Sequence, residues 1–334
     1  MPVGGIPAQC RGMDHHQPTV PASAPPAGGL AALGAPVESG VVAVATFIAV
    51  LFSAIAFAGV LSLVALGFVV LYRATRIINF AHGDLMTAGG YVAFFFINEV
   101  GLPIFAAYGV TIAMLFLAGV ALERLAYAPL RRASDIAVVL ATLGIAIAIR
   151  AGLGIWQGTT PKNLVSPFGS AVVHVGGANI SEQRLMIVVV VLVVIGALVL
   201  FFQGTQFGRQ MRSLATDREM AMLVGVRVNG MATLAFGISS GLAGLAGVLI
   251  SPLVAVDLNL GFNVMLLAFS AAVLGGFGSL TGILVASLVV GLTQQVIGNY
   301  VLQNYADVLP FVMMLAVIVL RPQGLFAGLS GWRV

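Results

Sequence analysis

A short polar cluster interrupts one of the long apolar runs of this chain. Residues 79–84 read Asn79-Phe80-Ala81-His82-Gly83-Asp84, and apolar sequence resumes at once after them. An imidazole and a carboxylate at membrane depth are costly unless they line a cavity, an aqueous path or a contact between helices. A helix can unwind at a glycine, and unwound backbone offers free N–H and C=O groups. The pattern favours a broken helix in the wall or gate of a solute path.

A plainer interpretation stays open for the same residues. Glycine also lets two helices approach closely, and His82 could donate a hydrogen bond between helices without touching a solute. A second glycine cluster, Gly275, Gly276 and Gly278, allows the same two interpretations.

Asp84 needs a partner, water or a proton, because an unpaired carboxylate in hydrocarbon costs several kcal/mol. The nearest candidates in sequence are Arg76, Asn79 and the helix-end N–H groups around Gly83. Arg150 lies near the outer end of another apolar run. Because long basic side chains extend along apolar surface toward water, we expect Arg150 to reach the membrane surface rather than a solute.

The composition defines the class of fold. Hydrophobic residues make up 60% of the 334 residues and charged residues only 8%, and the mean hydropathy is +1.09. Soluble domains carry roughly 25% charged residues. The apolar runs are long and continuous, as in membrane-spanning helices. The sequence therefore predicts an all-α integral membrane bundle of about 8–10 helices, with runs near 43–72, 80–97, 103–126, 137–157, 185–203, 231–252, 262–277, 281–298 and 306–320.

The arginines predict the orientation and the domain limits. They concentrate after the first, third, fifth and last runs, which places those loops in the cytoplasm. The loop 158–184, with a possible strand at 171–175, then faces outside. Residues 1–40 are rich in Pro, Ala and Gly and read as a disordered tail. Residues 41–326 form the membrane domain, and 327–334 a short cytoplasmic tail. The net charge of +4 follows from this topology, so no nucleic-acid partner is expected.

The cytoplasmic segment 204–230 is too polar to span a membrane and contains a short amphipathic helix. Its apolar positions are Leu214, Met222 and Leu223, and its polar positions are Arg212, Asp217, Arg218 and Glu219. Such a helix either lies solvated at the membrane surface or fits a groove on a soluble partner. The single lysine, Lys162, has no glycine-rich phosphate loop before it. If ATP drives transport, another chain hydrolyses it, and this chain is expected to bind no cofactor or metal.

Four stretches resemble the branched-chain amino acid permease family of ABC importers. Glu219-Met220-Ala221, three further residues and Gly225 resemble the Glu-Ala-Ala-x3-Gly signature of importer permeases, with Met in place of the middle Ala and without the downstream Ile-x-Leu-Pro. The other three are 73–84 with Gly89-Gly90-Tyr91, 271–279 with Gly282, and 307–310 through 321–326. The matches occur in family order and cover roughly 45–325.

The resemblance implies the non-catalytic, membrane-spanning subunit of an ABC importer in the bacterial inner membrane. Its partners would be a homologous second permease, two ATP-binding subunits and an extracytoplasmic substrate-binding protein. The cargo would be branched-chain amino acids, with urea, short amides or aromatic acids as the alternatives. Contact with the ATPase would involve Arg212, Asp217, Glu219, Ala221 and Gly225. The solute path or broken helices would involve Asn79, Ala81, His82, Gly83, Asp84 and the glycines at 275, 276 and 278.

Two other classes of protein compete with this interpretation. An ion-coupled secondary carrier needs buried acids on its path, and Asp84 is the only plausible intramembrane carboxylate. An intramembrane enzyme needs a nucleophile with a base, or metal ligands, at membrane depth. It ranks last, because His82 has no second histidine in a span.

Overall fold

The computed structural model describes residues 35–169, 171–175, 177–277, 279–300, 308–321 and Leu325. The chain divides into residues 1–40 and residues 41–334, and the fold belongs to the second unit. Most of the two predicted tails, and Gly278 of the second glycine cluster, lie outside the described residues.

The described residues contain six helices that are long and apolar enough to cross a membrane. These are α1 (Ala35–Thr75), α3 (Ile104–Leu122), α4 (Asp135–Gln157), α5 (Glu182–Gly204), α8 (Val228–Ile250) and α10 (Leu280–Tyr300). Three shorter helices are α2 (His82–Phe94), α9 (Leu260–Gly275) and α11 (Leu309–Leu320). Each of the nine predicted runs coincides with one of these helices. The predicted all-α membrane fold is confirmed, and the long first run forms a single helix.

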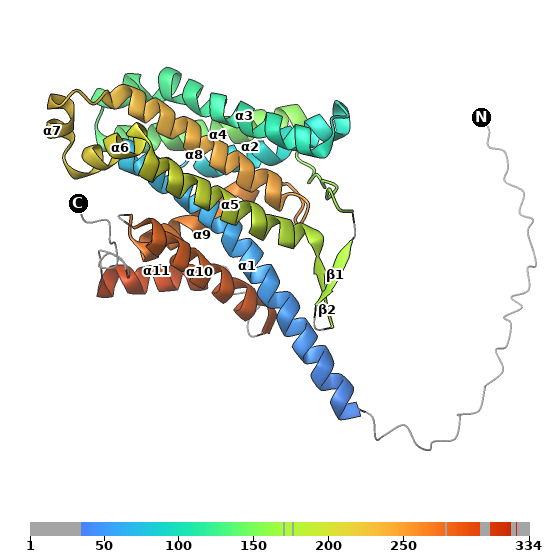
Figure 1. Ribbon diagram of the computed structural model, residues 1–334. Helices are drawn as coiled ribbons and strands as arrows, with labels where there is room; N and C mark the ends of the chain where they lie inside the picture. The colour runs from blue at the N-terminus through green and yellow to red at the C-terminus, as the bar shows by residue number, and fades with distance from the viewer. Residues whose placement is uncertain are drawn as a thin grey trace, which may run out of the picture. The chain divides into compact units, whose positions relative to one another are not determined.

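Inner and outer helices differ in burial. Most of the apolar span of α1 and of α8 is buried, whereas α4 and α5 expose most of theirs. α8 packs along both α2 and α3, and Figure 1 shows α3 and α8 side by side. The exposed positions of α4 and α5 are large and aliphatic, such as Leu140, Ile147 and Leu192. Lipid is as apolar as these side chains, so such surfaces are stable in a bilayer.

The chain is non-helical between α1 and α2. α1 ends at Thr75, Arg76 adopts a left-handed φ of +61°, and α2 starts at His82. The His82 ring contacts the backbone of Val64, which lies roughly three turns before the end of α1. The segment 76–81 therefore leads from the end of α1 back between the helices, and α2 begins deep in the bundle.

Short turns, strands and helices occupy the segments between the long helices. A π-helical turn, η1 (Phe95–Glu99), extends α2, and η2 (Glu123–Tyr127) extends α3 into a 3-10 turn, η3 (Pro129–Arg132). The predicted strand is present as β1 (Val172–Val175), which pairs antiparallel with β2 (Ala178–Ser181). The segment 204–230 forms two helices, α6 (Gln206–Thr216) and α7 (Arg218–Leu223), before α8 begins.

Candidate functional site: the polar break and the coupling segment

Asn79 organises the turn that leads into α2. Its Oδ1 atom accepts a hydrogen bond from the Ala81 N–H at 2.9 Å and another from the Tyr127 hydroxyl at 2.7 Å. Asn79 and Ala81 are both buried. An Asn side chain that bonds its own backbone two residues on replaces helical hydrogen bonds at a turn. Asn79 therefore fixes the end of the non-helical segment and ties it to the η2 turn.

His82 uses both ring nitrogens inside the protein. Its Nε2 lies 3.1 Å from the Val64 carbonyl oxygen on α1, and its Nδ1 lies 3.1 Å from the Ser239 hydroxyl on α8. The side chain is fully buried. The geometry supports the interpretation that His82 joins helices by hydrogen bonds.

Gly83 lies in the first turn of α2, so the unwound stretch precedes it. A Cβ atom at Gly83 would lie 2.5 Å from the Gly261 carbonyl oxygen and 2.8 Å from the Met265 Cβ. The Thr87 hydroxyl accepts a hydrogen bond from the Gly261 N–H at 2.9 Å. Gly83 thus permits α2 and α9 to approach closely, as the packing interpretation expects.

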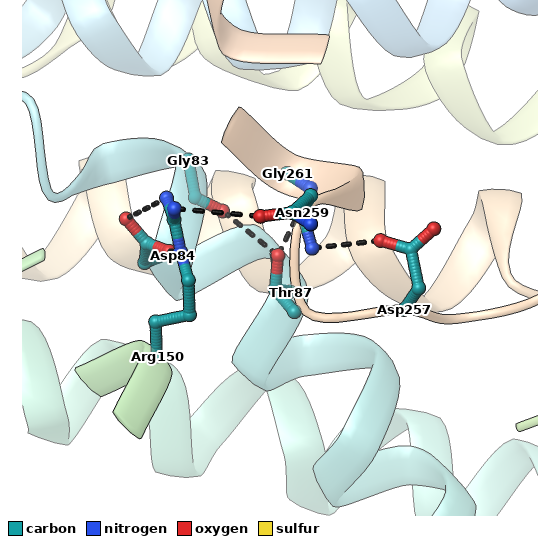
Figure 2. A network of polar contacts seen from close by, with 7 residues as sticks. All are labelled: Gly83, Asp84, Thr87, Arg150, Asp257, Asn259 and Gly261. Atoms are coloured by element: carbon teal, nitrogen blue, oxygen red, sulfur yellow. Dashed lines mark hydrogen bonds and ion pairs between the residues drawn. The ribbon is translucent and has the colours of Figure 1, made fainter. Parts of the chain in front are cut away.

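Asp84 forms a buried ion pair with Arg150 (Figure 2). Arg150 Nε donates to Oδ1 at 2.9 Å and Nη2 donates to Oδ2 at 3.3 Å. Asp84 has 0% of its side chain exposed and Arg150 has 28%. The paired guanidinium satisfies the buried carboxylate, a role that the sequence did not assign to Arg150. Two of the partners expected for Asp84, Arg76 and Asn79, bond elsewhere.

The network continues to the start of α9. Arg150 Nη1 donates to Asn259 Oδ1 at 3.4 Å, and the guanidinium lies 5.0 Å from the centre of the Phe262 ring. Asp257 Oδ1 accepts from the Asn259 N–H at 2.7 Å. Figure 2 shows Arg150 between Asp84, in the first turn of α2, and Asn259, which directly precedes α9. Sequence reasoning missed Asn259. The sequence signal that could have pointed to a polar partner is Arg150 itself, because it is the one charged residue of the apolar run 137–157.

The second glycine cluster ends α9. Gly275 is the last residue of α9, and Gly276 follows with φ of +78°. A Cβ at Gly275 would lie 2.6 Å from the Gly282 backbone on α10. Gly276 therefore ends α9, and Gly275 permits close contact between α9 and α10.

α6 is held against the end of α5. Gly208, Met211 and Leu214 form its buried side. Arg212 Nη1 donates to the Phe202 carbonyl oxygen at 2.8 Å, which satisfies a carbonyl at the C-terminal end of α5. Arg212 therefore anchors the segment rather than pointing away from the protein.

α7 is capped at both ends and exposes apolar side chains. Asp217 Oδ1 accepts from the N–H groups of Glu219 and Met220 at 2.9 Å and 3.0 Å. The Val226 N–H bonds the Ala221 carbonyl oxygen at 3.0 Å, and Gly225 has φ of +85°. This is a Schellman motif, in which glycine commonly takes the left-handed position after the helix. Ala221 is buried and Glu219 exposed, while the exposed apolar side chains are Met220, Met222, Leu223 and Val224.

A hydrogen bond links the non-helical segment 76–81 to residues 204–230, the coupling segment. Arg76 Nη2 donates to the Ala215 carbonyl oxygen, near the end of α6, at 2.8 Å. This hydrogen bond joins segment 76–81 to α6.

Known proteins with similar sequences define the class. The family model described as "Branched-chain amino acid transport system / permease component" matches residues 50–318. The chain therefore belongs to this family, and it is a multi-pass protein of the inner (plasma) membrane.

Individual proteins match this chain over most of its length. The permease protein BraD of Pseudomonas aeruginosa, from a high-affinity branched-chain amino acid transport system, is 30% identical over 79% of this chain and 90% of its own. LivH of Escherichia coli strain K12 is 29% identical over 84% of this chain and 95% of its own. A solved structure, PsaBC from Streptococcus pneumoniae in complex with Fab, covers 87% of this chain and 99% of its own, with 16% identity and a TM-score of 0.49.

Proposed function

We propose that this chain is the translocation subunit of an ATP-driven importer of branched-chain amino acids. The observation that carries the proposal is the coupling segment: α7 exposes Met220, Met222, Leu223 and Val224 on the side that the arginines predict to be cytoplasmic. Exposed apolar side chains on a rigidly capped helix are typical of a docking site. The proposed class of cargo, branched-chain amino acids, is inferred from the membership of this family.

The partners follow from the same proposal. α7 docks on one of two ATP-binding subunits, a homologous permease completes the path, and an extracytoplasmic binding protein delivers the solute. ATP is bound and hydrolysed by the partner subunits, and this chain holds no cofactor and no catalytic site. The Arg76–Ala215 hydrogen bond supports a mechanical role, because it connects the proposed ATPase contact to segment 76–81.

The buried network favours this proposal over an ion-coupled carrier. A carrier needs an acid that exchanges protons or ions along the path. Asp84 is instead bound by Arg150 through two hydrogen bonds. Within the proposed importer, this pair holds α4 beside the point where α2 and α9 begin.

Reconstitution tests the proposal. The chain is purified with the permease, ATPase and binding-protein partners and placed in proteoliposomes. We expect ATP-dependent accumulation of radiolabelled leucine, reduced by excess valine or isoleucine and unaffected by urea, acetamide or phenylacetate. Competition by urea, acetamide or phenylacetate would show that the cargo belongs to the class of that compound instead. Uptake driven by an ion gradient without ATP would overturn the proposal.

Leu223→Glu serves as the uncoupled variant in the same assay. The Leu223 side chain is 80% exposed, so a carboxylate there leaves the fold intact and opposes apolar docking. We expect lost uptake and lost ATPase co-purification at normal membrane abundance. The matched control is Ala221→Asp, which buries a charge and should instead lower abundance.

A further inference from the structure

A cavity of about 420 Å³ lies between four helices, at the end of the bundle that the arginines predict to face outside. The first half of α1, the start of α5, the end of α8 and the second half of α10 surround it. One face of α1 lines its length, through residues that recur every three or four positions: Thr46, Val50, Ser53, Phe57 and Val60. The cavity therefore follows α1 for roughly 21 Å.

Arg184 is the one charged residue among the described residues that line this cavity. Its side chain is partly buried, and within the described part of the chain it makes no hydrogen bond, ion pair or ring contact. A Cβ atom at Gly59 would lie 3.2 Å from Val191 on α5, so Arg184, about two turns before Val191, lies near the level of Ser53 on α1. A guanidinium that has lost part of its hydration and has no partner favours an anion, and it binds a carboxylate through two parallel hydrogen bonds.

α10 brings an uncharged polar side chain to the same level. A Cβ atom at Gly291 would lie 2.7 Å from the Ala58 Cβ, and the Tyr300 ring lies 6.5 Å from the Phe47 ring. α10 therefore runs opposite to α1. Gln295 lies between these two contacts, roughly at the level of the guanidinium.

Two oxygen atoms at this level can accept hydrogen bonds. The Gln295 side-chain amide has no partner among the residues that the structure describes. The Ser53 hydroxyl donates to a backbone carbonyl oxygen of its own helix at 2.9 Å, so its lone pairs remain available. An ammonium group would find both acceptors opposite the guanidinium.

The remainder of the cavity is apolar. Phe57 and Val60 on α1, Ile187 on α5 and Ile250 on α8 line it. A cavity of roughly 150 Å³ holds a benzene molecule, so the volume is ample for a branched aliphatic side chain. A cation and uncharged acceptors beside an apolar wall complement a zwitterion with an aliphatic side chain.

We propose that this cavity is an outer binding site for the zwitterion of an aliphatic α-amino acid. The Arg184 guanidinium receives the carboxylate, Gln295 and Ser53 receive the ammonium, and the aliphatic side chain lies against Phe57 and Val60. The choice of an amino acid rests on the proposed function. An anionic phospholipid offers related chemistry, an anion joined to an aliphatic chain, but would leave the acceptors on α1 and α10 unused.

Equilibrium binding tests the site in the assembled permease–ATPase complex in nanodiscs, without binding protein or ATP. The probes are leucine, leucinamide, which lacks the carboxylate, and 4-methylpentanoate, which lacks the ammonium. The variants are Arg184→Gln and Gln295→Leu, which should both keep the fold, because neither side chain has a partner within the described residues. Arg227→Gln and Gln203→Leu are the matched controls, since both residues are exposed and neither lines the cavity.

The proposal requires a crossed pattern of losses. Arg184→Gln should weaken the binding of leucine and 4-methylpentanoate roughly tenfold or more, as expected when a charged hydrogen bond is lost, and leave leucinamide binding unchanged. Gln295→Leu should weaken the binding of leucine and leucinamide roughly threefold or more and leave 4-methylpentanoate binding unchanged. Equal losses for all three probes, or no saturable leucine binding to the wild-type complex, would overturn the site.

Lipid analysis of the same complexes separates an amino acid from a lipid. The nanodiscs contain phosphatidylglycerol, and the lipid that stays bound to each purified variant in detergent is measured. Less phosphatidylglycerol on Arg184→Gln, with leucine binding unchanged, would assign the cavity to lipid and overturn the proposal. ATP-driven leucine uptake, measured with the binding protein present, would then still stand, whereas its absence would sink the proposed function instead.

Discussion

At the scale of single residues, the polar break is satisfied by long-range partners. Asp84 is paired with Arg150, His82 with Val64 and Ser239, and Asn79 with Tyr127. A buried ion pair adds little net stability when it forms, but removing one partner leaves a buried charge without compensation. This asymmetry makes the pair testable.

Arg150→Ala should destabilise the protein by about 3–5 kcal/mol, because Asp84 then stays buried without its partner. The double variant Asp84→Leu with Arg150→Leu should recover most of that loss, since apolar residues replace the pair. Thermal unfolding of the purified permease in detergent measures both. Arg227→Ala, an exposed arginine, is the control. Equal stability of Arg150→Ala and wild type would show that the pair is absent in solution.

Gly83→Ala should lower stability although it adds a single methyl group. The added Cβ would lie 2.5 Å from the Gly261 carbonyl oxygen, and this backbone atom can move only if α9 moves. Gly83→Leu should abolish transport for the same reason. Gly109→Ala on α3 is the matched control, because nothing lies within 4 Å of its Cβ position. A Gly83→Ala protein that unfolds at the wild-type temperature would contradict the close packing of α2 and α9.

At the scale of elements, the coupling segment is built by local rules. α6 is anchored on α5 through Arg212, and α7 is capped by Asp217 and ended by Gly225. The cap fixes the direction in which Leu223 and its apolar neighbours point. We therefore expect the contact with the ATPase to depend on the left-handed backbone conformation at Gly225 and not on the size of the side chain there.

Gly225→Val should reduce ATPase co-purification and uptake, because a β-branched residue strongly disfavours a φ of +85°. Gly225→Asn should retain most of both, since Asn tolerates the left-handed region. Nothing lies within 4 Å of the Cβ position, so a steric clash is not the cause. Membrane abundance is measured in parallel. If Asn and Val behave alike, the turn geometry is not what the ATPase contact requires.

At the scale of the whole molecule, the orientation in the membrane determines which end meets which partner. The β1–β2 hairpin belongs to the loop predicted to lie outside, and α6 and α7 belong to the segment predicted to lie inside. The cavity lined by Arg184 lies at the predicted outer end.

Cysteine labelling in intact cells checks this orientation. In a Cys10→Ser background, Val173→Cys on the exposed hairpin should react with a membrane-impermeant maleimide, and Thr216→Cys at the end of α6 should not. Both positions are exposed, so accessibility differs only by side of the membrane. Lysis should make Thr216→Cys reactive. Labelling of Thr216→Cys before lysis would reverse the topology.

The sequence by itself determined the apolar helices, the helical character of segment 204–230 and a strand within 171–175, where β1 covers Val172–Val175. These depend on hydropathy along the chain and on local backbone constraints, which neighbouring residues specify. Only the tertiary structure decided the partners within the polar break. Asp84 and Arg150 are 66 residues apart, and His82 and Ser239 are 157 apart. Which buried polar groups meet depends on how helices distant in sequence pack, and hydropathy carries no information about that packing.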